Sequence, residues 1–329
     1  MEPFIYLETG SQDPAYNLAF EEYVLQRRHK GTYLILWQNA NTVVIGRNQI
    51  AESEIQRTFI DAHHIRVVRR NTGGGAVYHD LGNLNYSFIT DAGDVSRLNM
   101  ARFAGLIIEA LSAMGIRAEA SGRNDILIDG HKVSGTAQQI SGTRILHHGT
   151  LLFDSDLDMV SGALRADPEK FRSKSTRSVR SRVGNIRDFL PADRTRPEFW
   201  KELKHFFLAD GAAQADLSPE ELAAVNELKC RKYDTWEWNF GEAPQYDLSR
   251  KRRWPGGTLE IRVQLERDQV TGIAFFGDFL APRPLDEITA ALTGLPFDPA
   301  AFSAVLTAEA VARSFGSITK DELLSTIFH

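Results

Sequence analysis

The chain has 329 residues, of which 43% are hydrophobic and 25% are charged, and its formal net charge is −5. This length predicts one large domain and a smaller one, and the negative charge argues against a protein that coats nucleic acid or an anionic membrane. No run could span a bilayer, the start lacks a signal peptide, and the single cysteine excludes an internal disulfide, so we expect a reduced, cytoplasmic compartment.

A capped helix is predicted near the start of the chain. Asp13 can cap it, Pro14 suits its first turn, and Leu18 lies on its apolar face. The 65–68 strand expected further on leads directly into a run of arginines and glycines, so this run joins two strands and is not followed by a helix. The strands of this region are expected over 34–37, 42–45, 65–68, 76–79 and 84–89.

The middle of the chain predicts one long helix and two hairpins. Apolar residues recur at helical spacing over 98–114, and Gly115 supplies the stop. Asp129-Gly130 is a favoured type I′ turn pair and predicts the first hairpin. The hairpin strands are expected, in chain order, over 126–128, 131–133, 137–140 and 144–153.

A domain boundary is expected in the stretch 241–257, which is rich in glycine, proline and charge. Beyond it, the alternating pattern of 259–263 and 272–276 predicts two strands, and three short helices are expected to follow. The sequence therefore predicts an α+β protein. A large domain of mixed or antiparallel sheet flanked by helices would span 1–243, and a smaller α+β domain would span 244–329.

The most informative run is Arg69-Arg70-Asn71-Thr72-Gly73-Gly74-Gly75. Glycines without side chains let backbone N–H groups approach a ligand, and arginines suit carboxylates and phosphates. The run lacks the spacing of a P-loop and of a dinucleotide-binding turn. A tight bulge in a hairpin is the plain alternative, but Arg70 next to bare amides favours an anion-binding loop.

A second run, Arg123 to Gly135, places Lys132 on a strand just after the predicted turn. An ammonium held by a sheet is an effective point charge for a carboxylate or a phosphate oxygen. The alternative is an ordinary solvated lysine. The small residues Gly135 and Ala137 favour the ligand-binding interpretation, because they leave room against the backbone.

A third run, 174–183, mixes four cations with hydroxyl residues and has almost no apolar anchor. This composition favours a surface loop that closes over an anion, and a solvated basic stretch is the alternative. Nucleic acid is a weaker interpretation, because no aromatic stacking platform accompanies the run.

The remaining polar residues do not predict a zinc site. His147 and His148 are neighbours on a strand and face opposite sides, so they cannot share a metal, and no paired cysteines occur. A Mg²⁺ ion accompanying a nucleotide is compatible with the sequence, with Asp125 as a protein ligand. Cys230 is expected to be a small buried residue.

Five runs together resemble the lipoate–protein ligase family over nearly the whole chain. Thr72 stands where many members have serine, which keeps the hydroxyl. The stretch from Trp236 resembles the linker and accessory C-terminal domain of the two-domain members. The five runs are 69–83, Gly122-Arg123-Asn124-Asp125, Lys132-Val133-Ser134-Gly135-Thr136-Ala137, His147-His148-Gly149-Thr150-Leu151-Leu152 and Ser178-Val179-Arg180-Ser181-Arg182-Val183.

The resemblance implies a biotin/lipoate-ligase-like fold and an ATP-dependent ligase. The family makes lipoyl-AMP from lipoic acid and ATP with loss of pyrophosphate. It then transfers the lipoyl group to a lysine of lipoyl-domain proteins, which are the E2 subunits of 2-oxoacid dehydrogenases and the glycine cleavage H protein. No nucleic acid or membrane partner is expected.

The resemblance also assigns roles to residues. Lys132 is the expected catalytic residue, since it can neutralise the lipoate carboxylate and the α-phosphate as they meet. Because an acyl-adenylate hydrolyses when water reaches it, the basic run 174–183 is expected to fold over the intermediate, and trimming 175–181 is expected to slow lipoyl-AMP formation and let intermediate leak. ATP and the adenylate are expected to contact Arg70, Gly75, Ala76, Val77, Tyr78, Asn124, Asp125, Lys132 and Arg180. Lipoate is expected to contact Leu18, Val44, Arg70, Gly74, Gly75, His79, Lys132, Ala137 and His148.

Three other functions are weaker. A cysteine-dependent octanoyl- or lipoyl-transferase would need an activated thiol, and no cysteine precedes Cys230. A biotin ligase would need a GRGRxG-type loop, which the chain lacks. A non-catalytic lipoate-binding or regulatory protein has no need for both the Lys132 run and the basic 174–183 run.

Overall fold

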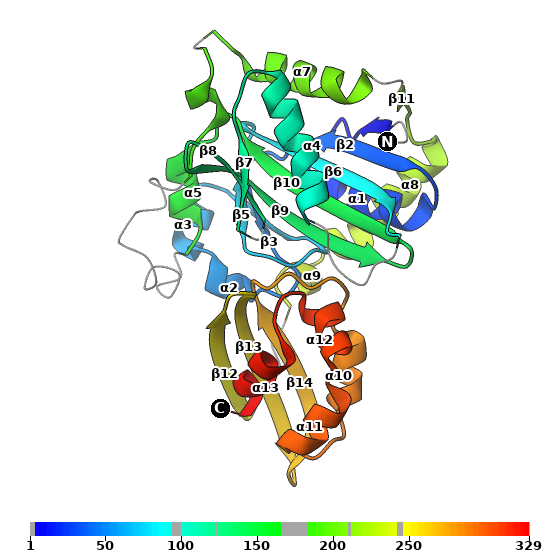
Figure 1. Ribbon diagram of the computed structural model, residues 1–329, viewed down its shortest axis with the longest axis vertical. Coiled ribbons are helices and arrows are strands. Elements are labelled where there is room, and N and C mark those ends of the chain that lie inside the picture. The colour runs from blue at the N-terminus through cyan, green and yellow to red at the C-terminus, as the bar shows by residue number, and fades with distance from the viewer. Residues whose placement is uncertain are drawn as a thin grey trace.

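The computed structural model describes residues 4–93, 100–122, 124–165, 183–191, 193–209, 212–241 and 246–328. Figure 1 shows a larger N-terminal part above a smaller C-terminal part. Among the described residues, no helix is both long and apolar enough to cross a membrane.

A large mixed sheet forms the centre of the N-terminal part. β1 pairs in parallel with β2 and β11, and the pairs from β2 through β6 and β10 to β9 are antiparallel. In spatial order the strands are β11 (Ala213–Gln214), β1 (Phe4–Glu8), β2 (Thr32–Trp37), β6 (Asn83–Asp91), β10 (Arg144–Leu152), β9 (His131–Ser141), β8 (Asp125–Ile128) and β7 (Glu119–Ser121).

Helices cover both faces of this sheet (Figure 1). Alternate residues of a strand face opposite sides, so each apolar strand contributes to two cores. On one face, Leu34 and Phe88 pack with α4 (Met100–Ala113) and α7 (Arg196–Leu208). On the other face, Ile35 and Trp37 pack with α1 (Pro14–Arg27) and α8 (Pro219–Leu228). As predicted, Asp13 caps α1 by accepting a hydrogen bond from the Ala15 amide.

A second, three-stranded sheet carries the glycine run. Its order is β4 (Arg66–Arg69), β3 (Thr42–Ile45) and β5 (Val77–His79), with β3 parallel to β4 and antiparallel to β5. Residues 70–76 connect β4 to β5, so the prediction that this run joins two strands is confirmed. The neighbouring helices are α2 (Ala51–Glu54), α3 (Arg57–Ala62) and α5 (Leu157–Ala163).

The chain leaves the large sheet through short helical segments. These are η2 (Ile186–Phe189), the π-helical turn η3 (Lys229–Tyr233) directly after α8, and α9 (Trp236–Asn239). The sequence did not predict the π-helical turn.

The C-terminal part has one three-stranded antiparallel sheet whose apolar face packs on helices. Residues 246–328 contain four helices rather than the three predicted, because the expected helical region divides at Leu306-Thr307. The elements are β12 (Leu248–Trp254), β13 (Gly257–Glu266), β14 (Gln269–Gly277), α10 (Asp286–Leu292), α11 (Pro299–Val305), α12 (Ala308–Phe315) and α13 (Lys320–Phe328).

Candidate active site

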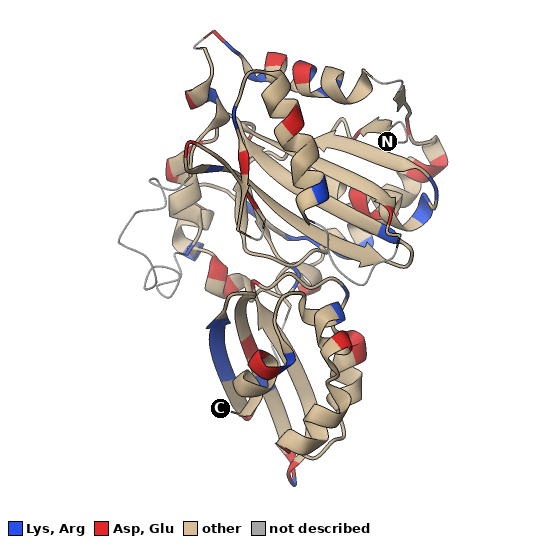
Figure 2. Ribbon diagram, in the orientation of Figure 1, with Lys and Arg blue, Asp and Glu red and all other residues tan. Residues whose placement is uncertain are grey.

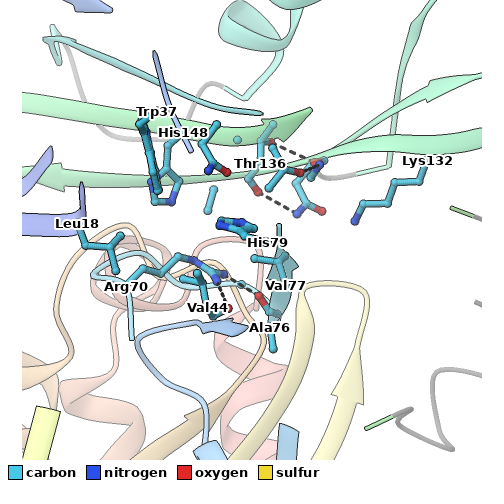
Figure 3. A pocket seen from close by; sticks show the side chains of 18 residues that line it. Leu18, Trp37, Val44, Arg70, Ala76, Val77, His79, Lys132, Thr136 and His148 are labelled. Atoms are coloured by element: carbon cyan, nitrogen blue, oxygen red, sulfur yellow. Dashed lines mark hydrogen bonds between the residues drawn. The ribbon is translucent and has the colours of Figure 1, made fainter. Parts of the chain in front are cut away.

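A cavity lies between the large sheet and the glycine run. Figure 3 shows Trp37, Thr136 and His148 on one side and Arg70, Val44 and Ala76 on the other. The space between its atoms, with the open solvent at its mouth included, is about 610 Å³. The lining residues are Leu18, Trp37, Val44, Arg70, Gly74, Gly75, Ala76, Val77, His79, Asn85, Asn124, Lys132, Gly135, Thr136, Ala137, His148, Gly149 and Thr150.

Most of the predicted ligand contacts line this single cavity. Two predicted residues, Tyr78 and Asp125, are described but do not line it, and a third is not among the described residues. The Tyr78 side chain faces away, because Val77 and His79 on either side of it in β5 face the cavity, and its hydroxyl donates to Asn41 Oδ1 at 2.7 Å. Asp125 does not line the cavity, but it forms an ion pair with Lys132, which does. Arg180, with 174–182 of the basic run, lies outside the described residues.

The guanidinium of Arg70 holds the glycine loop together. Its Nη2 donates to the carbonyls of Gly73 at 2.7 Å and Gly75 at 2.8 Å, Nη1 donates to Val44 at 3.2 Å, and Nε donates to Thr72 Oγ1 at 2.9 Å. Burial lowers the Arg70 pKa to about 10, so the group remains charged at neutral pH. Three of its five N–H donors serve the loop and a fourth serves β3, so its main contact is with the protein itself.

A buried hydrogen-bonded chain continues from Arg70 across the cavity floor. His148 Nε2 lies 2.8 Å from Thr72 Oγ1, and His148 Nδ1 lies 2.8 Å from Glu21 Oε1. Ser87 donates to the same Glu21 oxygen at 2.5 Å and accepts from Trp37 Nε1 at 2.8 Å. The order of hydroxyl, imidazole and carboxylate resembles a nucleophile with its base.

Thr72 is nevertheless not placed to attack a ligand. It is 0% exposed and does not line the cavity, and its oxygen already accepts a hydrogen bond from Arg70. The chain of hydrogen bonds therefore fixes the glycine loop relative to α1 and the large sheet.

Lys132 lies at the opposite side of the cavity on β9. Its Nζ pairs with Asp125 Oδ1 at 2.7 Å, and both side chains are 34% exposed. A Cβ atom at Gly135 would lie 3.1 Å from this Nζ, so the missing side chain gives the ammonium room. The predicted turn is confirmed, since Asp129 and Gly130 have φ values of 48° and 79°. The ammonium is therefore held on a strand and faces the cavity.

His79 and His148 line the cavity, whereas His147 does not. Burial, followed by the charges of Arg70 and His148, lowers the pKa of His79 to about 3, so His79 is neutral at pH 7. His147 faces the opposite side of β10, as predicted, and stacks on Phe103 with ring centroids 4.8 Å apart. Burial lowers its pKa to about 3 as well.

The C-terminal part contacts the back of the glycine loop. The amide of Gly74 donates to the carbonyl of Phe279 at 3.1 Å. A Cβ atom at Gly73 would lie 2.6 Å from that carbonyl oxygen and 2.9 Å from the Ala281 nitrogen. Glycine is therefore required here by the close approach of a neighbouring backbone as well as by any ligand.

Sequence reasoning missed several lining residues, of which Trp37, Asn85 and Thr150 are examples. Asn85 carried a usable signal, because it is a polar residue inside the otherwise apolar 84–89 strand. Trp37 gave no such signal, since a tryptophan at the end of an apolar strand is also typical of a core. The prediction that Cys230 is buried is wrong: it is exposed, because its position on η3 faces solvent.

Family models match most of the chain. The model described as the lipoyl protein ligase A/B catalytic domain matches residues 13–208. The model described as the bacterial lipoate protein ligase C-terminus matches residues 243–327. Residues 209–242, which include η3 and α9, lie between the two matches.

Individual relatives agree with these matches. The chain is 38% identical over 322 residues to the lipoate-protein ligase LplJ of Bacillus subtilis, which covers 96% of this chain and 97% of that protein. It is also similar to the structure of a bi-partite lipoate protein ligase and its E2 lipoyl domain from Thermoplasma acidophilum, with a TM-score of 0.64, 29% identity, and 75% and 100% of the two chains covered.

A crystal structure of lipoate-protein ligase A bound with ATP is similar as well. Its TM-score is 0.62 at 28% identity, and the match covers 73% of this chain and 99% of that chain. The predicted fold class, an α+β protein of the lipoate-ligase type, is confirmed by these neighbours.

Proposed function

The chain belongs to the lipoate–protein ligase family, and we propose that its central cavity carries out both steps of ATP-dependent lipoylation. The first step joins lipoate to the α-phosphorus of ATP, which gives lipoyl-AMP and releases pyrophosphate. In the second step, the amine of an acceptor lysine attacks the acyl carbonyl and AMP leaves.

The observation that carries this proposal is the placement of Lys132 opposite the glycine loop in one cavity. A carboxylate that attacks an α-phosphate brings two anions together, so the site must neutralise charge without blocking the line of attack. The Lys132 ammonium supplies the positive charge, and the amides of Gly75, Ala76 and Val77 supply neutral donors. Both interactions strengthen as negative charge accumulates between the reacting groups.

The apolar lining provides for the lipoyl tail. Leu18, Trp37, Val44 and Ala137 line the same cavity as Lys132. Because the pKa of His79 is about 3, this side chain adds no charge to the slot at neutral pH. We assign the tail to this group and the carboxylate to the end of the cavity that contains Lys132.

Mg²⁺ is proposed to accompany ATP, held mainly by the phosphates. The described residues contain no group of three or more histidine, cysteine or acidic side chains that could hold a metal ion. A single carboxylate, Asp125, next to Lys132 fits an ion that keeps its phosphate and water ligands. Bound Mg²⁺ would neutralise phosphate charge, and Asp125 would orient it.

The proposed acceptors are lipoyl-domain proteins, namely the E2 subunits of 2-oxoacid dehydrogenases and the glycine cleavage H protein. The related Thermoplasma acidophilum ligase, described together with its E2 lipoyl domain, supports this class of acceptor. We also propose that 244–329 is an accessory domain and 1–243 the catalytic one.

The function is tested by incubating the full chain with lipoate, MgATP and an apo lipoyl domain. We expect lipoate-dependent pyrophosphate release and an increase in acceptor mass by one lipoyl group. The variant Cys230→Ala should do the same, since the exposed thiol is not in the cavity. Acceptor modification without ATP, or its loss in Cys230→Ala, would instead support a thioester-forming transferase.

A further inference from the structure

A closed ring of hydrogen bonds lies behind the glycine loop, outside the cavity. Lys232 Nζ donates to Glu22 Oε2 at 2.8 Å and to Asn71 Oδ1 at 2.7 Å. Asn71 Nδ2 donates to the Tyr233 hydroxyl at 2.8 Å, and that hydroxyl donates to Glu22 Oε2 at 2.6 Å. Asn71 belongs to the glycine run, whereas Lys232 and Tyr233 belong to the π-helical turn.

The ring is mostly buried. Glu22 is 7% exposed, Asn71 8% and Tyr233 1%, and the Lys232 side chain is 20% exposed. Burial would raise the pKa of Glu22, but the charge of Lys232 and the hydrogen bonds from Tyr233 and Asn71 lower it overall. The Lys232 ammonium also lies 4.1 Å from the centre of the Trp238 ring. Buried ion pairs add little net stability, so this arrangement needs another reason.

Neighbouring residues of the run are anchored on alternate sides. Arg70 and Thr72 bond on the cavity side, through His148 to Glu21. Asn71 bonds on the opposite side, through Lys232 and Tyr233 to Glu22. Glu21 and Glu22 are consecutive on α1, so one helix fixes the start of the glycine loop from both sides.

Arg69 extends the outer anchor. Its Nη2 donates to the Asn239 carbonyl at 2.9 Å, Nε donates to the Trp238 carbonyl at 2.8 Å, and its backbone amide donates to Asn239 Oδ1 at 2.8 Å. The segment 229–239 therefore contacts both Arg69 and Asn71 on the outer side of the glycine run. This segment falls in 209–242, which neither family model matches.

We propose that Lys232 and Tyr233 are positioning residues for adenylate formation, which hold Asn71 and thereby keep the glycine loop in the conformation that receives the phosphates of ATP. This inference rests on the proposed function. It gives the π-helical turn an indirect role in the active site, since no residue of the turn lines the cavity. π-Helical turns occur often at functional sites because they displace side chains from regular helical positions.

The test measures lipoate-dependent pyrophosphate release by Lys232→Met, Tyr233→Phe and Asn71→Ala, well below their melting temperatures. We expect each variant to raise the KM for ATP by about tenfold, with a smaller change in kcat. Lys229→Met is the matched control. Lys229 lies on the same turn but pairs with Asp13 and Asp234 instead of the glycine run, so its KM for ATP should stay unchanged.

The double variant Lys232→Met/Asn71→Ala should be no worse than either single one, because both changes remove the same contact. Asn71→Ala leaves the buried Glu22–Lys232 pair intact, so it provides the test even if Lys232→Met fails to fold. The inference is overturned by any one of three results: an unchanged KM for ATP in Asn71→Ala, an equal rise in KM in Lys229→Met, or additive effects in the double variant. The proposed function still stands in each case if the wild type is active. A wild-type chain that releases no pyrophosphate overturns both.

Discussion

The guanidinium of Arg70 donates to three backbone carbonyls and to the hydroxyl of Thr72. The sequence indicated that Arg70 belongs with the glycine loop, because an arginine next to bare amides favours an anion site. It could not indicate that most donors of this arginine would be used by the loop itself. That outcome depends on β3 bringing the Val44 carbonyl alongside, which is a tertiary contact.

Arg70→Lys should damage the loop although it keeps the charge. A lysine at this position has three donors on one atom and cannot reproduce the planar fork, so at least one of the four hydrogen bonds is lost. We expect the free energy of unfolding to fall by about 1–3 kcal/mol. The kcat/KM for pyrophosphate release should fall by about tenfold or more. Urea unfolding and the pyrophosphate assay measure the two effects, and wild-type values in both would show that the loop does not need this residue.

At the level of secondary structure, local signals predicted the turns and the buried strands. Asp129-Gly130 forms the expected left-handed turn because its rule depends on two residues alone. The prediction of separate strands at 131–133 and 137–140 is wrong, since β9 runs unbroken over His131–Ser141. Its first half, up to Gly135, pairs with β8, and its second half, from Thr136, pairs with β10. The strand β1 was missed, because its partners β2 and β11 come from distant parts of the sequence.

In the candidate site, too, residues in short local motifs were predicted and residues that depend on tertiary contacts were missed. Motif residues such as Gly75, Lys132 and His148 were found because they carry chemistry in short runs. Trp37 was not, because only the pairing of β2 with β6 in the large sheet brings it to the cavity. The positioning role of η3 also depends on contacts between residues more than 150 positions apart in the chain.

The two ends of the glycine triplet should respond differently to alanine. At Gly73 an added Cβ would meet the backbone of Phe279 and Ala281, which cannot move away easily. At Gly75 the same atom would meet nothing within 4 Å. We expect Gly73→Ala to lower the free energy of unfolding by about 1–3 kcal/mol and Gly75→Ala to change it by less than about 0.5 kcal/mol.

Denaturant unfolding of both alanine variants makes the comparison. Equal stabilities would mean that the contact between the glycine loop and the C-terminal part is not maintained in solution.

For the whole molecule, two buried histidines make stability depend on pH. His79 and His147 have pKa values of about 3 in the folded protein, against about 6.5 in the unfolded chain. Between these values the unfolded chain binds more protons. Their contribution is therefore complete above pH 6.5 and is lost as the pH falls towards 3. Each histidine should contribute a slope of up to about 1.4 kcal/mol per pH unit.

Urea unfolding at pH 5, 6 and 7 should show this loss of stability before the carboxylates titrate. In His147→Gln the slope should become shallower, since one buried imidazole is removed. The exposed His205→Gln is the control and should keep the wild-type slope. A His147→Gln slope equal to that of the wild type would contradict the account of burial.

The fold as a whole places the Lys132 ammonium and the amides of the glycine loop on opposite sides of one cavity, part of whose lining is apolar. Both sheets, α1 and the C-terminal part contribute to this arrangement. In this arrangement, the Lys132 charge allows two anions to react. Because Lys132 is partly exposed and its ion pair with Asp125 is partly solvated, removal of this side chain should leave the fold intact.

The most direct test compares wild type and Lys132→Ala with lipoate and MgATP, by pyrophosphate release and by the mass of lipoyl-AMP bound to the protein. We predict that the wild type accumulates bound lipoyl-AMP. The variant should unfold at the same temperature but form no detectable adenylate. Adenylate formation by Lys132→Ala at close to the wild-type rate would contradict the catalytic role of Lys132.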